Sequence, residues 1–120
     1  MKYIGTVQRG NKIGRTINFP TANLNVKDDN IKFGVYASKV IYDNKEYFGI
    51  SNYGLHLTIK KLLVPILETH ILDFDKEIYD EKIEVELIKF IREEKDFSNL
   101  EKLKNQLEKD KDQVLKILEK

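Results

Sequence analysis

Residues 34–51, Gly34-Val-Tyr-Ala-Ser-Lys-Val-Ile-Tyr-Asp-Asn-Lys-Glu-Tyr-Phe-Gly-Ile-Ser51, determine the fold class of this chain. The segments 34–42 and 46–51 are rich in β-branched and aromatic side chains, which favour strands. Asp43-Asn44-Lys45 lies between them, and Asp and Asn accept the backbone angles of a tight turn. The stretch therefore predicts an antiparallel hairpin.

Other strand patterns lie on both sides of this hairpin. Residues 3–8 are short and β-branched, and residues 67–74 alternate along their length. Residues 83–91 place four apolar side chains on one face, Ile83, Val85, Leu87 and Ile91. Residues 55–65 fit no pattern and are expected to form a loop. Short strands separated by turns predict a mainly β fold, a small closed antiparallel barrel of about six strands.

The last part of the chain changes from strand to helical periodicity. Ser98 and Glu101 have the spacing of a capping box, with Ser98 as the N-cap. Apolar residues then recur at helical spacing, at Leu100, Leu103, Leu107, Val114, Ile117 and Leu118. Asp110 and Lys111 interrupt this stripe, so one of them is expected to meet a polar partner near the barrel. The chain is expected to be one domain, with a barrel over about 1–97 and a helix over about 98–119.

Composition excludes several classes of function. The 120 residues carry 21 basic and 20 acidic side chains, a balance that does not favour nucleic acid or an anionic membrane as a partner. The absence of cysteine excludes disulfides and thiolate metal sites. No apolar run approaches the roughly 20 residues of a membrane span. A cytoplasmic monomer is expected.

The segment 10–23 carries the strongest chemical signal. Gly10 and Gly14 allow backbone N–H groups to approach an anion, and Arg15 is a fork-shaped phosphate donor. The spacing differs from that of a Walker A loop. Thr21 and Asn23 follow with neutral oxygens, which suit a divalent metal that arrives with a polyphosphate. The alternative interpretation of Pro20-Thr-Ala-Asn23 is an ordinary turn.

Two later segments offer further candidates. Glu68, with His70 on the same strand face, has the chemistry to accept a proton from a substrate hydroxyl, although a solvated outward glutamate is the alternative. Arg92 is one of only three arginines, and Phe97 follows it at the strand-to-helix junction. Together they suit a flat heteroaromatic ring. The alternative there is a surface arginine followed by a core phenylalanine.

As an ordered set, these segments closely resemble the riboflavin kinase (flavokinase) family, over essentially the whole chain. The landmarks are Gly5-x-Val7, Gly10 to Arg15, Phe19-Pro-Thr-Ala-Asn23, Gly34-Val-Tyr-Ala37, Asn52-x-Gly54, Glu68-Thr-His70, Asp73-Phe74, Tyr79, Arg92-x-Glu94-x-x-Phe97 and Asp110. The resemblance implies a Greek-key barrel with a C-terminal helix. It also implies ATP-dependent phosphorylation of riboflavin to FMN, by a unit found alone or as the C-terminal half of a bifunctional riboflavin kinase/FAD synthetase.

The resemblance also implies roles for individual residues. Glu68 matches the catalytic glutamate. Mg²⁺, or another divalent metal bound with ATP, would be held by Thr21 and Asn23. The other matches are Gly10 and Arg15 at the nucleotide phosphates, Asp73 and Tyr79 at the adenine end, and Arg92, Lys95 and Phe97 at the flavin.

Departures from the family pattern affect loops. Asn18 and Asp80 replace usual glycines, and Leu57 replaces a usual proline, so loop geometry and affinity differ from the pattern while no reacting group is lost. Two alternatives to a kinase remain open. One is a flavin- or nucleotide-binding module of the same fold with weakened catalysis. The other is a small-barrel nucleic-acid binder, which the near-zero net charge does not favour.

Overall fold

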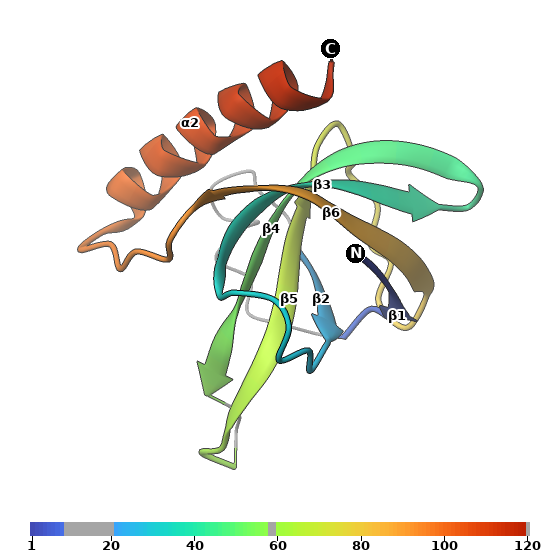
Figure 1. Ribbon diagram of the computed structural model, residues 1–120, viewed down its shortest axis with the longest axis horizontal. Helices are drawn as coiled ribbons and strands as arrows, with labels where there is room; N and C mark the ends of the chain where they lie inside the picture. Colours follow the sequence, from blue (N-terminus) through green and yellow to red (C-terminus); the bar gives the residue numbers. More distant parts are fainter. Residues whose placement is uncertain (9–20, 58–59, 120) are drawn as a thin grey trace.

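A computed structural model describes residues 1–8, 21–57 and 60–119. Its elements are β1 (Lys2–Thr6), β2 (Thr21–Asn25), β3 (Gly34–Tyr42), β4 (Lys45–Leu57), β5 (Leu63–Ile71), β6 (Lys82–Arg92) and helix α2 (Leu100–Leu118). The strands pair antiparallel in the order β1-β6-β3-β4-β5-β2. The backbone N–H of Gln8 donates to the Asn23 carbonyl oxygen at 2.7 Å, which brings the two end strands together. The expected fold class is confirmed as six antiparallel strands in a nearly closed barrel with one C-terminal helix (Figure 1).

The hairpin predicted from residues 34–51 is present. Its loop consists of Asp43 and Asn44, whose φ angles of 51° and 61° are left-handed. Both residue types tolerate this region, and the resulting twist matches that of the flanking strands. Tyr42 therefore pairs directly with Lys45, and the register of β3 against β4 follows from the turn.

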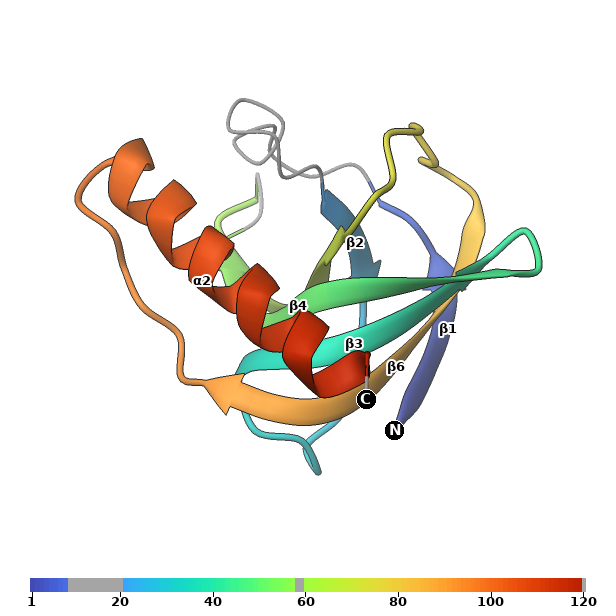
Figure 2. The ribbon, with the colours of Figure 1, turned by 90° about the horizontal axis from the view of Figure 1, so that it is seen from above.

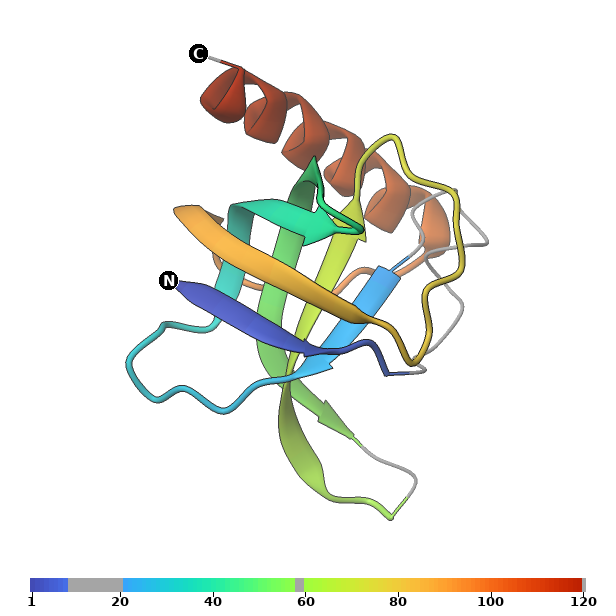
Figure 3. The ribbon, with the colours of Figure 1, turned by 90° about the vertical axis from the view of Figure 1, so that its right-hand side faces the viewer.

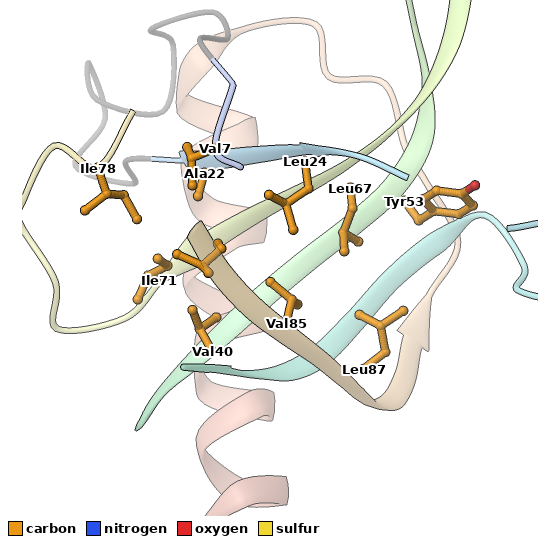
Figure 4. Packing of buried hydrophobic residues seen from close by; sticks show 11 residues of the cluster. Val7, Ala22, Leu24, Val40, Tyr53, Leu67, Ile71, Ile78, Val85 and Leu87 are labelled. Carbon is orange, nitrogen blue, oxygen red and sulfur yellow. The ribbon is translucent and has the colours of Figure 1, made fainter. Parts of the chain in front are cut away.

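The hydrophobic core has two parts, one on each face of the sheet. The barrel interior is filled by Val7, Ala22, Leu24, Val40, Tyr53, Leu67, Ile71, Ile78, Ile83, Val85 and Leu87 (Figure 4). On the outer face, α2 crosses β3 and β4 (Figure 2) and buries a second cluster, Val35, Ala37, Ile50, Leu72, Leu107 and Val114. Strands β3 and β4 therefore bury side chains on both faces. The part of the outer face that α2 does not cover remains accessible to a ligand.

In the middle of the chain, one expectation about local structure was wrong, and so was one alternative interpretation. Residues 55–65 are largely strand, because β4 and β5 continue together up to the pair Leu57 and Leu63. Thr21–Asn25 is strand β2 and not a turn, since each of its residues pairs with β5. Strand pairing with a distant segment overrides the turn propensity of Thr and Asn.

The helix begins later than predicted. Its N-cap is Asn99 and not Ser98, since the Asn99 side-chain oxygen accepts a hydrogen bond from the Lys102 backbone N–H at 2.9 Å. Asparagine is as good an N-cap as serine, so starting the helix one residue later costs little free energy. Leu100, expected in the apolar stripe, is 45% exposed. No helix in the described part of the chain is long and apolar enough to cross a bilayer.

The end of β6 departs from simple alternation. Its register against β3 shifts next to Val35 and next to Ala37. Bulges of this kind change which side chains face the core. Ile91 therefore packs with the outer cluster beneath α2 rather than with Ile83 and Val85 in the barrel, contrary to the face assigned from the sequence.

The backbone next to the irregular pairing of β3 with β6 requires a glycine at position 34. Its φ is 152°, and a Cβ there would collide with the Phe90 ring and lie 2.9 Å from the Arg92 carbonyl oxygen. We expect Gly34→Ala to lower the free energy of unfolding by about 1–3 kcal/mol in a urea titration followed by circular dichroism. Gly5→Ala is the matched control, because the nearest atom is an ordinary 3.4 Å from its Cβ. A Gly34→Ala protein as stable as Gly5→Ala would contradict this account.

Candidate active site

The candidate residues meet because strand register places them in one row. Asn23 on β2 pairs directly with Glu68 on β5, and Glu68 pairs with Asn52 on β4. The row continues through Val35 on β3 to Arg92 on β6. Directly paired antiparallel residues project from the same face with Cβ atoms roughly 5 Å apart. The row therefore lies on the outer face, where α2 covers only one end.

Two pockets meet beside this row. One, of about 120 Å³, lies between the row and α2, and is lined by Val35, Ile50, Asn52, Glu68, His70, Arg92, Glu94, Lys95, Phe97, Leu103, Leu107 and Asp110. The other, of about 30 Å³, is lined by Val7, Thr21, Ala22, Ile71, Phe74, Lys76, Glu77, Ile78 and Tyr79. Thr21 of the smaller pocket pairs across the sheet with His70 of the larger one. Groups bound in the two pockets would thus approach each other at Thr21, Asn23, Glu68 and His70.

Asn23 has an unused acceptor at this junction. Its side chain is only 7% exposed, and its Oδ1 accepts no hydrogen bond within the described ranges. A buried carbonyl oxygen without a partner has a free-energy cost, so such an atom indicates a ligand. Thr21 lies two residues earlier on the same face of β2. The two neutral oxygens fit a hard divalent cation that brings phosphate oxygens with it. The described residues contain no cluster of three His, Asp or Glu as an alternative metal site.

Arg92 is held by the helix. Its Nε and Nη2 donate to Asp110 Oδ1 and Oδ2 at 2.9 and 2.8 Å, and its Nη1 donates to the Glu93 carbonyl oxygen at 3.0 Å. Gln106 also donates to Asp110, which is 1% exposed. The polar partner expected for Asp110 or Lys111 is therefore Arg92. This bidentate pair fixes the guanidinium and attaches α2 to the barrel beside the larger pocket.

We expect Asp110→Ala to lower the free energy of unfolding by about 2–4 kcal/mol, because it leaves the Arg92 charge largely buried without its partner. Asp112→Ala is the matched control, since Asp112 is an exposed aspartate two residues later in the same helix. Its effect should stay within about 0.5 kcal/mol. Equal stabilities of the two variants in urea unfolding would show that the pair contributes nothing.

Reasoning from the sequence assigned no role to Asn52 and Glu94. Asn52 Oδ1 is buried and has no hydrogen-bond partner among the described residues, while its Nδ2 donates to Glu94 Oε2 at 3.4 Å. A Cβ at Gly54 would collide with the Glu94 carboxylate, so the glycine makes room for it. The signal for this group was the Asn52-x-Gly54 landmark inside a strand.

Only some of the remaining residues predicted to bind a substrate line one of the two pockets. Lys95 and Phe97 line the larger pocket, and Tyr79 lines the smaller one. Asp73 is exposed and is not among the residues lining either pocket. Gly10 and Arg15, like Gly14 and Asn18, lie outside the described residues.

The family model and the curated relatives agree on one family. The riboflavin kinase family model matches residues 1–118. The chain is 44% identical to the bifunctional riboflavin kinase/FMN adenylyltransferase of Listeria monocytogenes, over 88% of this chain and 34% of that protein. It is 39% identical to the RNA-binding riboflavin kinase RibR of Bacillus subtilis, over 88% and 46% of the two chains. The chain thus spans about a third to a half of these relatives. The riboflavin kinase structure from Trypanosoma brucei shares the fold, with a TM-score of 0.67 and 21% identity over 99% and 80% of the two chains.

Proposed function

The chain belongs to the riboflavin kinase family, and we propose that it transfers the terminal phosphoryl group of ATP to the 5′-hydroxyl of riboflavin, giving FMN and ADP. One observation carries this proposal. Glu68, which lines the larger pocket on the outer face, pairs directly with Asn23, and Asn23 lies two residues after Thr21 of the smaller pocket. A proton acceptor and a phosphate-side ligand are thereby adjacent, as transfer between two bound substrates requires.

The larger pocket is assigned to the flavin. Phe97 offers an aromatic face for the isoalloxazine ring, and Lys95 offers hydrogen-bond donors to its polar edge. Asp110 fixes one edge of the Arg92 guanidinium, so the role of Arg92 is to hold the pocket wall in place as well as to contact the ring. The unpaired Oδ1 of Asn52 suits a hydroxyl or N–H donor of the same ligand.

The smaller pocket is assigned to the nucleotide. Tyr79 and Phe74 supply aromatic surface for the adenine, and Thr21 lies at the end of this pocket next to Asn23. Asp73, Gly10 and Arg15 belong to this proposal on the resemblance alone. The net charge of +1 suits small phosphorylated substrates better than a nucleic acid partner.

Phosphoryl transfer would then proceed in one step. The 5′-oxygen of riboflavin forms a bond to the terminal phosphorus while the bond from that phosphorus to the bridging oxygen of ADP breaks. Glu68 orients the hydroxyl and accepts its proton as the new bond forms. Thr21 and Asn23 would hold a divalent metal that arrives with ATP, and this metal would supply positive charge to stabilise the transferred group. Most of the acceleration comes from this alignment.

The test is incubation of the 120-residue chain with riboflavin, ATP and Mg²⁺, followed by chromatography for FMN and ADP. FMN and ADP in equal amounts would support the proposal. Tight riboflavin binding without FMN would favour the alternative of a binding module with weakened catalysis. Absence of both binding and turnover would contradict the assignment of the two pockets.

A further inference from the structure

The β4–β5 hairpin continues past the barrel. Pairing of β4 with β3 ends at Tyr53, and pairing of β5 with β2 ends at Ile66. Beyond these points residues 55–57 and 63–65 pair only with each other in the described part of the sheet. Figures 1 and 3 show this two-stranded ribbon projecting from the rest of the molecule. It has an open edge on each side, and Pro65, which has no N–H to donate, lies in this projecting part.

One face of the ribbon is apolar and exposed. Leu55 pairs with Pro65 and Leu57 pairs with Leu63, so these four side chains share a face, here called the leucine face. It continues the interior face of the barrel, because the next residues with the same orientation are the buried Tyr53 and Leu67. Yet Leu55, Leu57 and Leu63 are 48%, 67% and 65% exposed. A contiguous apolar face of this kind marks a binding surface.

A groove runs along the base of the leucine face. Its volume is about 310 Å³, and it is lined by Lys27, Asp28, Asp29, Ile31, Phe33, Tyr53, Leu55 and Pro65. Phe33 packs against Tyr53 with ring centroids 5.2 Å apart, yet remains 42% exposed. The groove is therefore lined by apolar side chains together with the acidic side chains of Asp28 and Asp29.

The charges at the two ends of this surface are opposite. Lys60 and Lys61 are exposed at the tip of the ribbon, while Asp28 and Asp29 outnumber Lys27 at the groove. Asp28 is fixed by hydrogen bonds from the Asn30 backbone N–H at 2.9 Å and from the Tyr3 hydroxyl at 2.8 Å. These bonds, that of Asn30 first, hold the pKa of the Asp28 carboxyl below its ordinary value. The groove end is thus acidic at neutral pH.

We propose that the leucine face is a homodimer interface, in which the ribbon of each copy fills the groove of the other. A two-fold axis requires a self-complementary surface, with apolar area at its centre and opposite charges at its ends. This surface meets both conditions. In such a dimer Leu57 and Leu63 of one copy contact Phe33 and Leu55 of the other. The lysines at each tip lie beside the acidic end of the partner's groove.

Dimerisation also compensates for a liability of the isolated ribbon. A two-stranded ribbon alone has marginal stability in water and needs packing against a further element. Covering the leucine face removes Leu55, Leu57 and Leu63 from water, and burial of apolar surface favours association. Because the surface is small, the dimer should be weak, with a Kd in roughly the micromolar range.

Sedimentation equilibrium over a concentration series tests the proposal. We expect the 120-residue chain to shift from monomer to dimer over roughly micromolar concentrations, and Leu57→Ser to raise the Kd at least about tenfold. Ile4→Ser is the matched control, because Ile4 on β1 is 72% exposed but lies away from the ribbon. Equal weakening by both variants would indicate non-specific association and overturn the proposal.

Charge reversal tests the orientation of the two copies. Lys60→Glu/Lys61→Glu alone and Asp29→Lys alone should each weaken self-association, because each opposes like charges at the interface. Mixed together, the two variants should form a heterodimer, in which both contacts join opposite charges. Failure of the mixture to associate better than either variant would overturn this arrangement. A monomer at every concentration would overturn the proposal and would agree with the monomer expected from the sequence.

Discussion

Glu68→Gln is expected to reduce kcat for FMN formation by about 10²- to 10⁴-fold, the usual contribution of a general base. Glutamine keeps the shape of the side chain and one acceptor oxygen, so the Kd for riboflavin should change far less. The reason is positional, because Glu68 lies at the junction of the two pockets, directly opposite Asn23. Initial-rate assays of FMN formation measure the effect on kcat, and a fluorescence titration with riboflavin measures the effect on its Kd.

Glu94→Gln is the matched control for this substitution. Glu94 also lines the larger pocket, where it receives a hydrogen bond from Asn52, whereas the third carboxylate there, Asp110, is paired with Arg92. It is not paired with Asn23, and its substitution should leave kcat within a few-fold of the unmodified chain. A Glu68→Gln protein within about threefold of the original kcat would assign Glu68 a structural role, and a large loss in Glu94→Gln would identify Glu94 as the base.

Asn23→Ala is expected to reduce FMN formation at least about 100-fold at ordinary Mg²⁺ and ATP concentrations, and to raise the Mg²⁺ concentration needed for half-maximal rate. Thermal stability should be nearly unchanged. The reason for this combination is that Asn23 Oδ1 is buried yet accepts no hydrogen bond from the described residues, so its removal costs the fold little.

Asn25→Ala provides the comparison for the metal ligand. Asn25 projects from the same face of β2 two residues later, but it is exposed and pairs with Ile66 at the end of the β2–β5 ladder. Its substitution should affect neither the rate nor the Mg²⁺ requirement. An Asn23→Ala protein with unchanged turnover would remove Asn23 from the metal site. A protein that lost activity and melted much earlier would show that Asn23 supports the fold.

Local patterns in the sequence predicted a large part of this molecule. The alternation in residues 67–71 places Leu67 inside the barrel and Glu68 and His70 outside, because a strand's side-chain period of two is a local property. The turn at Asp43-Asn44 and the apolar stripe of the C-terminal helix are local in the same sense. The loop expected for residues 55–65 and the turn considered as an alternative for residues 20–23 were wrong, because these segments largely form strands by pairing with distant segments.

What the tertiary structure alone decided is the position of the candidate residues relative to one another. Asn23, Glu68, Asn52 and Arg92 come from four strands, and their common row depends on registers set by packing of the barrel interior and by the shifts in β6. The same holds for Arg92 and Asp110, which meet only because α2 folds back over the sheet. Local periodicity in the sequence determines which face a residue of a regular strand occupies, whereas the bulges in β6 place Ile91 on the opposite face. Which faces and rows come together depends on contacts between residues far apart in the chain, and those exist only in the folded protein.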